Sequence, residues 1–204
     1  MGKHFNNLLS YTAAYLLVQK AFGADRLRRV CVDILAPREG ERILDVGCGP
    51  AYILDYMPPV VYHGFDTEQH YINYARHKYA GKGHFYCEPY TMARAQQLEP
   101  FDGVMFMGLL HHLPDDMCHD VLDLVAQSLK PGGRVVTLEP CFVDGQSAIA
   151  RYVAAHDRGR FVRDEQAYAA LVEFHFSSVE RKVVHNVGRL PSTEIIMRLE
   201  NPAN

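Results

Sequence analysis

The chain has 204 residues, of which 48% are hydrophobic and 22% are charged, and its formal net charge is −3. This composition predicts one globular domain over 1–204, because disordered chains are less hydrophobic and dedicated polyanion binders are basic. No apolar run approaches the roughly 20 residues that a membrane-spanning helix needs. Five cysteines occur without a Cys-x-x-Cys spacing, which is typical of free thiols in a reducing compartment. We therefore expect no membrane span and a cytoplasmic location.

The first predicted element is helical and covers residues 5–36. In its second part, apolar side chains recur at helical spacing and predict one buried stripe: Leu27, Val30, Cys31, Ile34 and Leu35. Pro37 and Gly40 then end the helical pattern.

Short apolar runs alternate with helical segments between residues 42 and 139. The predicted strands are 42–46, 60–65, 84–87, 101–107 and 134–138. A helix capped by Thr67 is expected through about Tyr79, a second helix covers 115–129, and 89–98 is a short helix or a loop. Strands that alternate with helices predict a parallel sheet with right-handed crossovers.

The alternation stops after Glu139. Two helices are predicted over 144–156 and 164–174. Two strands, 179–187 and 193–199, follow and are expected to form an antiparallel pair at the edge of the sheet.

A glycine-rich turn, Asp45-Val46-Gly47-Cys48-Gly49-Pro50-Ala51, follows the first predicted strand. Glycine has no Cβ, so a ligand can approach the backbone there closely. The turn lies at the carboxyl end of the parallel sheet, where open α/β folds bind their ligands. Asp66 ends the second strand at the same edge, where a carboxylate can accept hydrogen bonds from both hydroxyls of a ribose.

Two kinds of ligand compete for this geometry, and a plain tight turn is the third reading. A dinucleotide needs the spacing G-x-G-x-x-G, with its pyrophosphate on a helix N-terminus. Here the third glycine position is the bulky Tyr52. Asp45 precedes the first glycine by two residues, and its carboxylate would repel a pyrophosphate. An acid at that position suits a ligand with an ammonium or sulfonium group.

Four segments of the chain, in this order, resemble the motifs of one family, the class I S-adenosylmethionine-dependent methyltransferases: ILDVGCGPA (43–51), HGFDT (63–67), FDGVMFMGLLHHL (101–113) and LKPGGRVVTLEP (129–140). The resemblance implies S-adenosylmethionine as the cofactor. It also implies a Rossmann-like α/β fold, a doubly wound, mostly parallel, seven-stranded sheet with an antiparallel C-terminal strand.

The resemblance divides the single domain into four parts. Residues 1–36 would form a helical lid over the cofactor, 42–139 the cofactor-binding core, 140–175 a helical insertion, and 178–200 the C-terminal strand pair.

The resemblance also implies where the cofactor lies. Gly47 and Gly49 would run along its methionine part, Asp66 would hold the ribose, and Met107 and Gly108 would pass its reactive end. Glu88, where the family more often has Asp, would lie near the adenine. The full predicted set of cofactor-binding residues is Asp45, Gly47, Cys48, Gly49, Asp66, Thr67, Glu88, Met107, Gly108 and Tyr11.

Two features near this set have competing readings. Ala51 replaces the third glycine of the first motif, a departure that the family tolerates. Tyr11 could hydrogen-bond the cofactor carboxylate or line the acceptor pocket. Tyr11 and Tyr15, one helical turn apart, could instead pack as a pair on the sheet.

His111 and His112 follow the fourth predicted strand, at the edge that faces the cofactor. A hydroxyl acceptor must lose its proton, and histidine has a pKa suited to a base near neutral pH. His112 is the predicted base, because the resembling family often keeps that histidine in its small-molecule members. His111 would orient it or support the loop, and either residue could instead only pack or cap the next helix. No metal is expected, because adjacent histidines on a loop rarely meet at one tetrahedral site.

The predicted function is methyl transfer to a small-molecule acceptor, with oxygen as the preferred atom. Carbon or nitrogen methylation, a nicotinamide-dependent oxidoreductase and a noncatalytic cofactor-binding protein are the alternatives. Nucleic acid is not expected as a partner, and the protein would be a monomer or a homodimer. Three arginines, Arg158, Arg160 and Arg163, either bind an anionic acceptor or form solvated surface.

Overall fold

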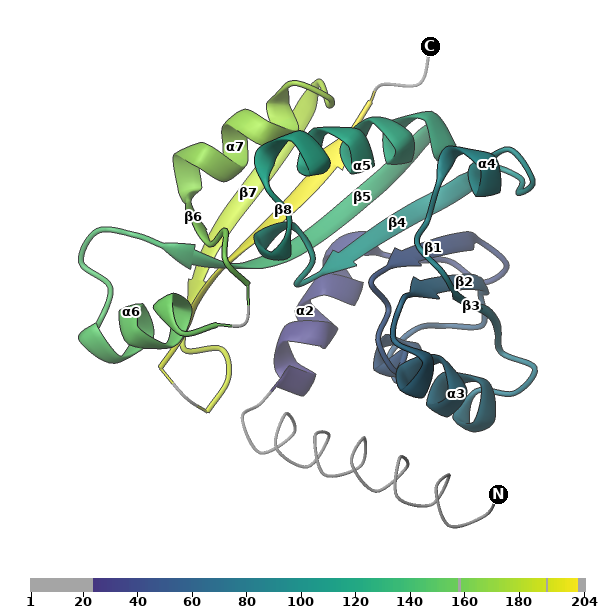
Figure 1. Ribbon diagram of the computed structural model, residues 1–204, viewed down its shortest axis with the longest axis horizontal. Coiled ribbons are helices and arrows are strands. Elements are labelled where there is room, and N and C mark those ends of the chain that lie inside the picture. The colour runs from purple at the N-terminus through teal and green to yellow at the C-terminus, as the bar shows by residue number, and fades with distance from the viewer. Residues whose placement is uncertain (1–23, 158, 190, 202–204) are drawn as a thin grey trace.

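The computed structural model describes residues 24–157, 159–189 and 191–201. Its central feature is a sheet in which seven strands follow the order β3-β2-β1-β4-β5-β8-β7 (Figure 1). The bounds of these strands are β1 Arg42–Val46, β2 Val61–Asp66, β3 Gly83–Cys87, β4 Phe101–Met107, β5 Leu129–Phe142, β7 Ser178–His185 and β8 Thr193–Glu200. Strands β1 to β5 pair in parallel, while β8 runs antiparallel to both β5 and β7. The predicted fold class is therefore confirmed.

Helices cover both faces of the sheet, as the doubly wound pattern requires (Figure 1). Helices α2 and α3 lie on one face, where their apolar side chains share a core with Ile43, Tyr62 and Met105 of the sheet. Helices α5 and α7 lie on the other face, around a second core. The helix bounds are α2 Ala24–Leu35, α3 Gln69–Lys78, α4 Met92–Ala95, α5 Asp115–Ser128, α6 Ala148–Ala155 and α7 Glu165–Glu173, with 3-10 turns η1 Tyr52–Asp55 and η2 Leu110–His112. Across the described ranges, no helix combines the length and the apolar character needed to cross a membrane.

The structure differs from the predicted elements mainly at their ends. Strand β5 begins at Leu129, directly after α5, whereas the sequence predicted a strand over 134–138 only. A two-residue strand, β6 (Arg163–Asp164), pairs with the end of β5 and was not predicted. Thr67 does not cap α3, because Glu68 occupies the N-cap position. Of the predicted helix 5–36, only α2 falls within the described residues.

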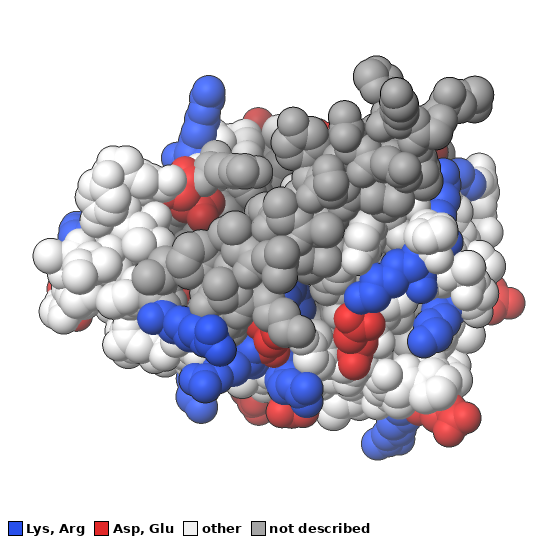
Figure 2. All heavy atoms as spheres, turned by 90° about the horizontal axis from the view of Figure 1, so that it is seen from below, with Lys and Arg blue, Asp and Glu red and all other residues white. Residues whose placement is uncertain are grey.

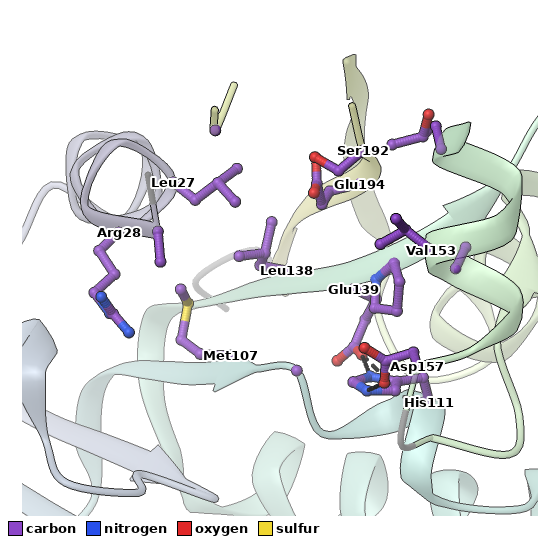
Figure 3. Close-up of a pocket in the computed structure, with 17 residues that line it drawn as sticks. Leu27, Arg28, Met107, His111, Leu138, Glu139, Val153, Asp157, Ser192 and Glu194 are labelled. Carbon is purple, nitrogen blue, oxygen red and sulfur yellow. Dashed lines mark hydrogen bonds and ion pairs between the residues drawn. The ribbon is translucent and has the colours of Figure 1, made fainter. Parts of the chain in front are cut away.

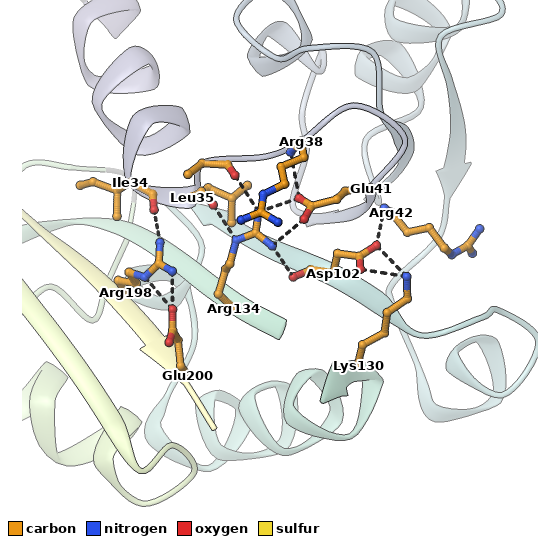
Figure 4. Close-up of polar contacts among 11 residues, drawn as sticks. Ile34, Leu35, Arg38, Glu41, Arg42, Asp102, Lys130, Arg134, Arg198 and Glu200 are labelled. Atoms are coloured by element: carbon orange, nitrogen blue, oxygen red, sulfur yellow. Dashed lines mark hydrogen bonds and ion pairs between the residues drawn. The ribbon is translucent and has the colours of Figure 1, made fainter. Parts of the chain in front are cut away.

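The C-terminal end of α2 is fixed to the sheet by arginines from two strands (Figure 4). Arg134 of β5 donates to the carbonyl of Leu35 at 2.6 Å and pairs with Glu41 at 2.6 Å. Arg198 of β8 donates to the carbonyl of Ile34. Charge-assisted hydrogen bonds to helix carbonyls are among the stronger ones in proteins. The first turns of α2 are thereby held over the carboxyl ends of β4 and β5, where the cavities described below lie.

Candidate functional site

The glycine-rich turn after β1 adopts a left-handed backbone at three positions. The φ angles are +77° at Gly47, +52° at Gly49 and +58° at Ala51. A Cβ at Gly47 would meet the side chain of Leu109 at 3.3 Å, whereas the space beside Gly49 is open. The backbone N–H groups of Gly47 and Cys48 donate to the carbonyl of Phe65, at 2.8 and 3.0 Å. The turn is therefore folded against the end of β2, with open backbone facing outward.

Asp66, at the end of β2, holds this turn in place. Its Oδ2 accepts a hydrogen bond from the Gly49 N–H at 2.8 Å, and its Oδ1 accepts one from the Glu68 N–H at 2.8 Å. An ionised carboxylate has about four acceptor positions, so each oxygen can accept a further bond from a ligand. Asp66 lies where the sequence predicted an acceptor for ribose hydroxyls.

Asp45 is a buried carboxyl group next to the turn. The Tyr62 hydroxyl donates to its Oδ2 at 2.6 Å, while Oδ1 has no hydrogen-bond partner among the described residues. Burial raises the pKa of Asp45 to about 7, although the hydrogen bond from Tyr62 opposes this shift. A buried acceptor without a partner costs free energy until a donor reaches it. A ligand with a hydrogen-bond donor or a positive charge would meet this requirement.

Two adjoining cavities surround the turn. The first, here called the turn cavity, has a volume of about 680 Å³ and is lined by residues of the turn, by Asp66 and Thr67, and by the segment after β4. The second, the Tyr90 cavity, has a volume of about 460 Å³ and a mostly apolar wall. Residues shared by both are Gly47, Asp66, Thr67 and Leu109. The two together suit a ligand with a polar part and a flat apolar part.

Nine of the ten predicted cofactor-binding residues fall in the described part of the chain. The turn cavity is lined by eight of them: Asp45, Gly47, Cys48, Gly49, Asp66, Thr67, Met107 and Gly108. Glu88 lines the Tyr90 cavity, where its carboxylate pairs with Arg94 at 2.5 Å. Tyr11, like Tyr15, lies outside the described residues.

A third cavity, the His111 cavity, lies between α2, α6 and the beginning of β8 (Figure 3). Its volume is about 400 Å³. Leu27, Leu138 and Val153 give the cavity an apolar wall. Glu139 and Glu194 also line it (Figure 3). Arg28, Met107 and Gly108 line both this cavity and the turn cavity. The end of β4 therefore forms a wall that the two cavities have in common.

His111 is buried between two carboxylates at one side of this cavity (Figure 3). Its Nδ1 lies 2.6 Å from Glu139 Oε2, and its Nε2 lies 2.9 Å from Asp157 Oδ1. Burial by itself lowers the pKa of His111, but the hydrogen bonds with Asp157 and Glu139 outweigh it and raise the pKa to about 9. At neutral pH the His111 ring is therefore protonated on both nitrogens and carries a positive charge.

Glu139 anchors the whole segment after β4. It is fully buried, and besides His111 Nδ1 its two oxygens accept the backbone N–H groups of Leu109, Leu110 and His111 at 2.9 to 3.2 Å. Such a set of donors compensates the cost of burying a carboxylate. The position of both histidines thus depends on one residue at the carboxyl end of the neighbouring strand.

His112 is exposed and lines the turn cavity, while its ring centroid lies 4.1 Å from that of His111. The structure thus places the two predicted catalytic histidines side by side, with His111 in one cavity and His112 in the other.

The segment after α6 closes one side of the His111 cavity. Its Asp157 pairs with His111, and the Phe161 N–H donates to the carbonyl of His111 at 2.9 Å. A Cβ at Gly159 would come within 1.9 Å of the His111 ring, so only glycine allows this approach. Arg163 donates to the carbonyls of Leu110 and Leu113 and pairs with Asp115.

The three predicted arginines therefore have different positions. The Arg163 guanidinium is used within the fold, Arg160 is exposed, and Arg158 lies outside the described residues. This finding favours a structural role for Arg163 over contact with an anionic acceptor.

Glu139, Asp157 and Glu194 are site residues that the sequence reasoning missed. Glu139 had a signal, because it is an acidic residue that ends an apolar strand within a recognised motif. Asp157 and Glu194 had none, since each is one acidic residue in a segment without a pattern. Only the folded chain brings them to the cavity.

Comparisons with known proteins relate this chain to methyltransferases. Residues 43–133 match a family model described as a methyltransferase domain. The chain is 28% identical over 184 residues to the tRNA U34 carboxymethyltransferase of Chromohalobacter salexigens, covering 83% of this chain and 50% of that protein. It is 36% identical over 117 residues to the ubiquinone biosynthesis O-methyltransferase of Thiobacillus denitrificans, covering 53% of this chain and 48% of the relative. The chain thus spans about half the length of these two relatives.

Among solved structures, human N-acetylserotonin methyltransferase in complex with S-adenosylmethionine has the same fold. The TM-score is 0.66 at 14% sequence identity, with 97% of this chain and 56% of that chain covered. At this level of identity the likeness concerns the fold alone.

Proposed function

We propose that this chain is a class I S-adenosylmethionine-dependent methyltransferase and that it transfers a methyl group to a hydroxyl oxygen of a small acceptor bound in the His111 cavity. The observation that carries this proposal is the wall that the turn cavity and the His111 cavity share at Met107 and Gly108. A cofactor in one cavity and an acceptor in the other would meet at this wall. Holding two reactants together in this way is the main contribution of such an enzyme.

The residues around the turn fit S-adenosylmethionine, which supplies a methyl group on a positively charged sulfur when it is bound. Asp45 offers an unpaired buried oxygen and Asp66 offers acceptor positions, so both suit a cationic ligand with hydroxyl groups. Gly47 and Gly49 leave the backbone open to the methionine part. The apolar Tyr90 cavity, with Glu88 in its wall, suits the adenine.

The walls of the His111 cavity favour an acceptor with an apolar body and one or more hydrogen-bond donors. Leu27 and Val153 supply apolar contact. Glu194 points into the cavity and has an oxygen without a hydrogen-bond partner among the described residues, and burial raises the pKa of this carboxyl. A hydroxyl or amine of the acceptor would satisfy this oxygen.

Of the two histidines, His112 is the one that we assign to the removal of the acceptor proton. His111 is protonated at neutral pH, because its pKa is raised to about 9, and both of its ring nitrogens are engaged by carboxylates. His111 therefore acts as a positioning residue for the segment that carries His112. If the acceptor atom were a neutral amine, the reaction would need little base catalysis, and replacing His112 would have a small effect.

A tRNA acceptor is the alternative that the name of one relative raises. Binding to a polyanion depends on clustered positive charge. Figure 2 views the molecule from below the orientation of Figure 1, and on the coloured part of that face Lys and Arg side chains lie among Asp and Glu side chains. The net charge of the chain is −3. We therefore favour a small molecule.

The test has two arms. S-adenosylhomocysteine should raise the melting temperature of the purified chain, whereas NAD and NADP should not, and the reverse result would favour an oxidoreductase. Radiolabelled methyl from S-adenosylmethionine should then enter a small-molecule extract and not bulk tRNA. Label in tRNA would contradict the proposed acceptor class, and no transfer to either would favour a noncatalytic protein.

A further inference from the structure

Three potential metal ligands converge at one side of the His111 cavity. His111, His112 and Asp157 each offer one donor atom, and these atoms all lie within 4.8 Å of one another. His111 and Asp157 line the His111 cavity, and His112 lines the turn cavity. Two of the three are neighbours in the sequence, but Asp157 comes from the segment after α6. The sequence therefore could not indicate that they meet.

The buried residue of the three is oriented as a metal-binding histidine usually is. In most metal sites a ligating histidine donates its other ring N–H to a carboxylate, a backbone carbonyl or a water molecule, which fixes the tautomer and the ring orientation. Glu139 Oε2 lies 2.6 Å from His111 Nδ1. The opposite nitrogen, Nε2, points to Asp157 Oδ1 at 2.9 Å. The Glu139 carboxylate is held in turn by the backbone N–H groups of Leu109, Leu110 and His111, which donate to it.

The spacing and the charge suit a small divalent cation. Around a tetrahedral Zn²⁺, with bonds of about 2.0–2.1 Å, neighbouring donor atoms are about 3.4 Å apart. With the cation in place of the shared proton, His111 Nε2 and Asp157 Oδ1 would separate by about half an ångström. Donor atoms of the three residues that lie up to 4.8 Å apart would have to move closer together, which the exposed side chain of His112 permits. The carboxylates of Glu139 and Asp157 carry two negative charges, which a divalent cation neutralises. Two imidazoles and one carboxylate are ligands of Zn²⁺ and of neighbouring transition metals rather than of Mg²⁺ or Ca²⁺.

We propose that His111 Nε2, His112 and Asp157 form a binding site for a divalent transition-metal ion of the Zn²⁺ class, with Glu139 as the carboxylate that orients His111. Three protein ligands leave one coordination position for a substrate atom. The site lies on the wall of the His111 cavity, so this position is open to the acceptor.

The catalytic role of the ion rests on the proposed function. A bound cation lowers the pKa of a hydroxyl group beside it. The acceptor hydroxyl would lose its proton to solvent, and its oxygen would form a bond to the methyl carbon as the carbon–sulfur bond breaks. The products are a methyl ether and S-adenosylhomocysteine. With the ion bound, His112 would be a ligand and would no longer act as the base that the proposed function assigns to it. Activity that is lost on chelation would indicate the ligand role, and activity that chelation leaves unchanged would indicate the simple base.

The direct test is a titration of the chelator-treated full chain with Co²⁺, in which the visible absorption of the bound Co²⁺ is recorded after each addition. The wild-type chain should bind one Co²⁺ per chain, Zn²⁺ should displace it, and Mg²⁺ should not. His112→Gln and Asp157→Asn should each weaken binding at least tenfold. Glu139→Gln, if it folds, should weaken binding about 10- to 100-fold through the loss of the orienting carboxylate.

His119→Gln is the matched control. His119 Nδ1 lies 2.8 Å from His175 Nε2, so this variant removes a histidine from a second pair that could bind Co²⁺ adventitiously. The control should bind Co²⁺ as the wild type does. The proposal is overturned if no stoichiometric binding occurs, if His119→Gln abolishes it while the ligand variants keep it, or if an intense thiolate band assigns the ion to cysteines.

The same samples distinguish this proposal from the proposed function. S-adenosylhomocysteine binding without Co²⁺ binding would leave the methyltransferase function in place and remove the metal site. Co²⁺ binding without S-adenosylhomocysteine binding would do the opposite.

Discussion

The turn cavity and the His111 cavity share a wall but are built in different ways. The turn cavity is formed by four short segments of the chain between Arg28 and His112, and its shape depends mainly on the backbone turn after β1. The His111 cavity brings together α2, the end of β5, α6 and the start of β8. One cavity is therefore determined by local chain conformation, and the other by long-range packing. Substitutions in one should leave the binding function of the other largely intact.

The largest expected effect concerns turnover at the boundary between the two cavities. His112→Ala should lower turnover by roughly 10²- to 10⁴-fold, because it removes the group that assists proton loss from the acceptor hydroxyl. Single-turnover rates with a radiolabelled methyl donor measure this loss once an acceptor is in hand. A change below about threefold would leave His112 only a packing role and favour an amine acceptor.

A large effect on stability is expected at Glu139, which supports the His111 cavity. Glu139→Ala should lower the free energy of unfolding by about 3–5 kcal/mol, since it leaves His111 and three backbone N–H groups buried without their partner. Urea denaturation measures the change. Glu99→Ala is the control, because the Glu99 side chain is 81% exposed and its ion pair with Arg42 should contribute less than about 1 kcal/mol. Equal effects of the two variants would contradict the anchoring role of Glu139.

The ion pairs of His111 predict a pH dependence of stability. The pKa of His111 is about 9 in the folded chain and lies near 6.5 in the unfolded chain, so the stabilisation is complete below pH 6.5 and is lost as the pH rises through 9. The groups that face it are Glu139, Asp157 and His112.

The chelator-treated, metal-free wild-type chain should lose on the order of 2–3 kcal/mol of unfolding free energy between pH 6.5 and pH 9, relative to His111→Asn treated in the same way. Denaturation at pH 6, 8 and 10 measures both chains. Parallel curves for the two would show that the pair does not hold His111 protonated.

The smallest expected effect concerns the turn cavity. Asp66→Ala should weaken binding of S-adenosylhomocysteine by about 1–3 kcal/mol, through lost hydrogen bonds to a charged group. Calorimetric titration measures the affinity. Asp144→Ala, outside all three cavities, serves as the control, and an unchanged affinity in Asp66→Ala would place the ribose elsewhere.

The sequence predicted the fold well, and most of the residues that it assigned to cofactor binding lie together around the turn cavity, because both depend on local patterns. The spacing of Gly47 and Gly49 and the position of Asp66 after an apolar run are properties of short segments. The ends of elements were predicted less well, as at β5, where Leu129 continues directly from α5 into a strand. Pro131 and Gly132 lie at an irregularity of β5, where the register with β4 passes from Leu129 directly to Arg134, and propensity alone does not report such a continuation of the strand.

The His111 cavity was only partly predictable, for a physical reason. His111 and His112 were found because they follow a recognisable strand, but their chemical states depend on residues far along the chain. Asp157 reaches His111 because Gly159 allows the segment after α6 to approach closely. No spacing in the sequence encodes that contact. The predicted absence of a metal rested on the adjacency of the two histidines and on the lack of a Cys or Glu at the usual spacings, and the position of Asp157 supports the opposite proposal.

The most direct test of the central claim is a crystal structure of the chain with S-adenosylhomocysteine. The account predicts the ribose hydroxyls within hydrogen-bond distance of Asp66, the adenine in the Tyr90 cavity, and the sulfur beside Met107 and Gly108, facing the His111 cavity. A ligand whose sulfur lies away from that shared wall, or that occupies the His111 cavity itself, would contradict it.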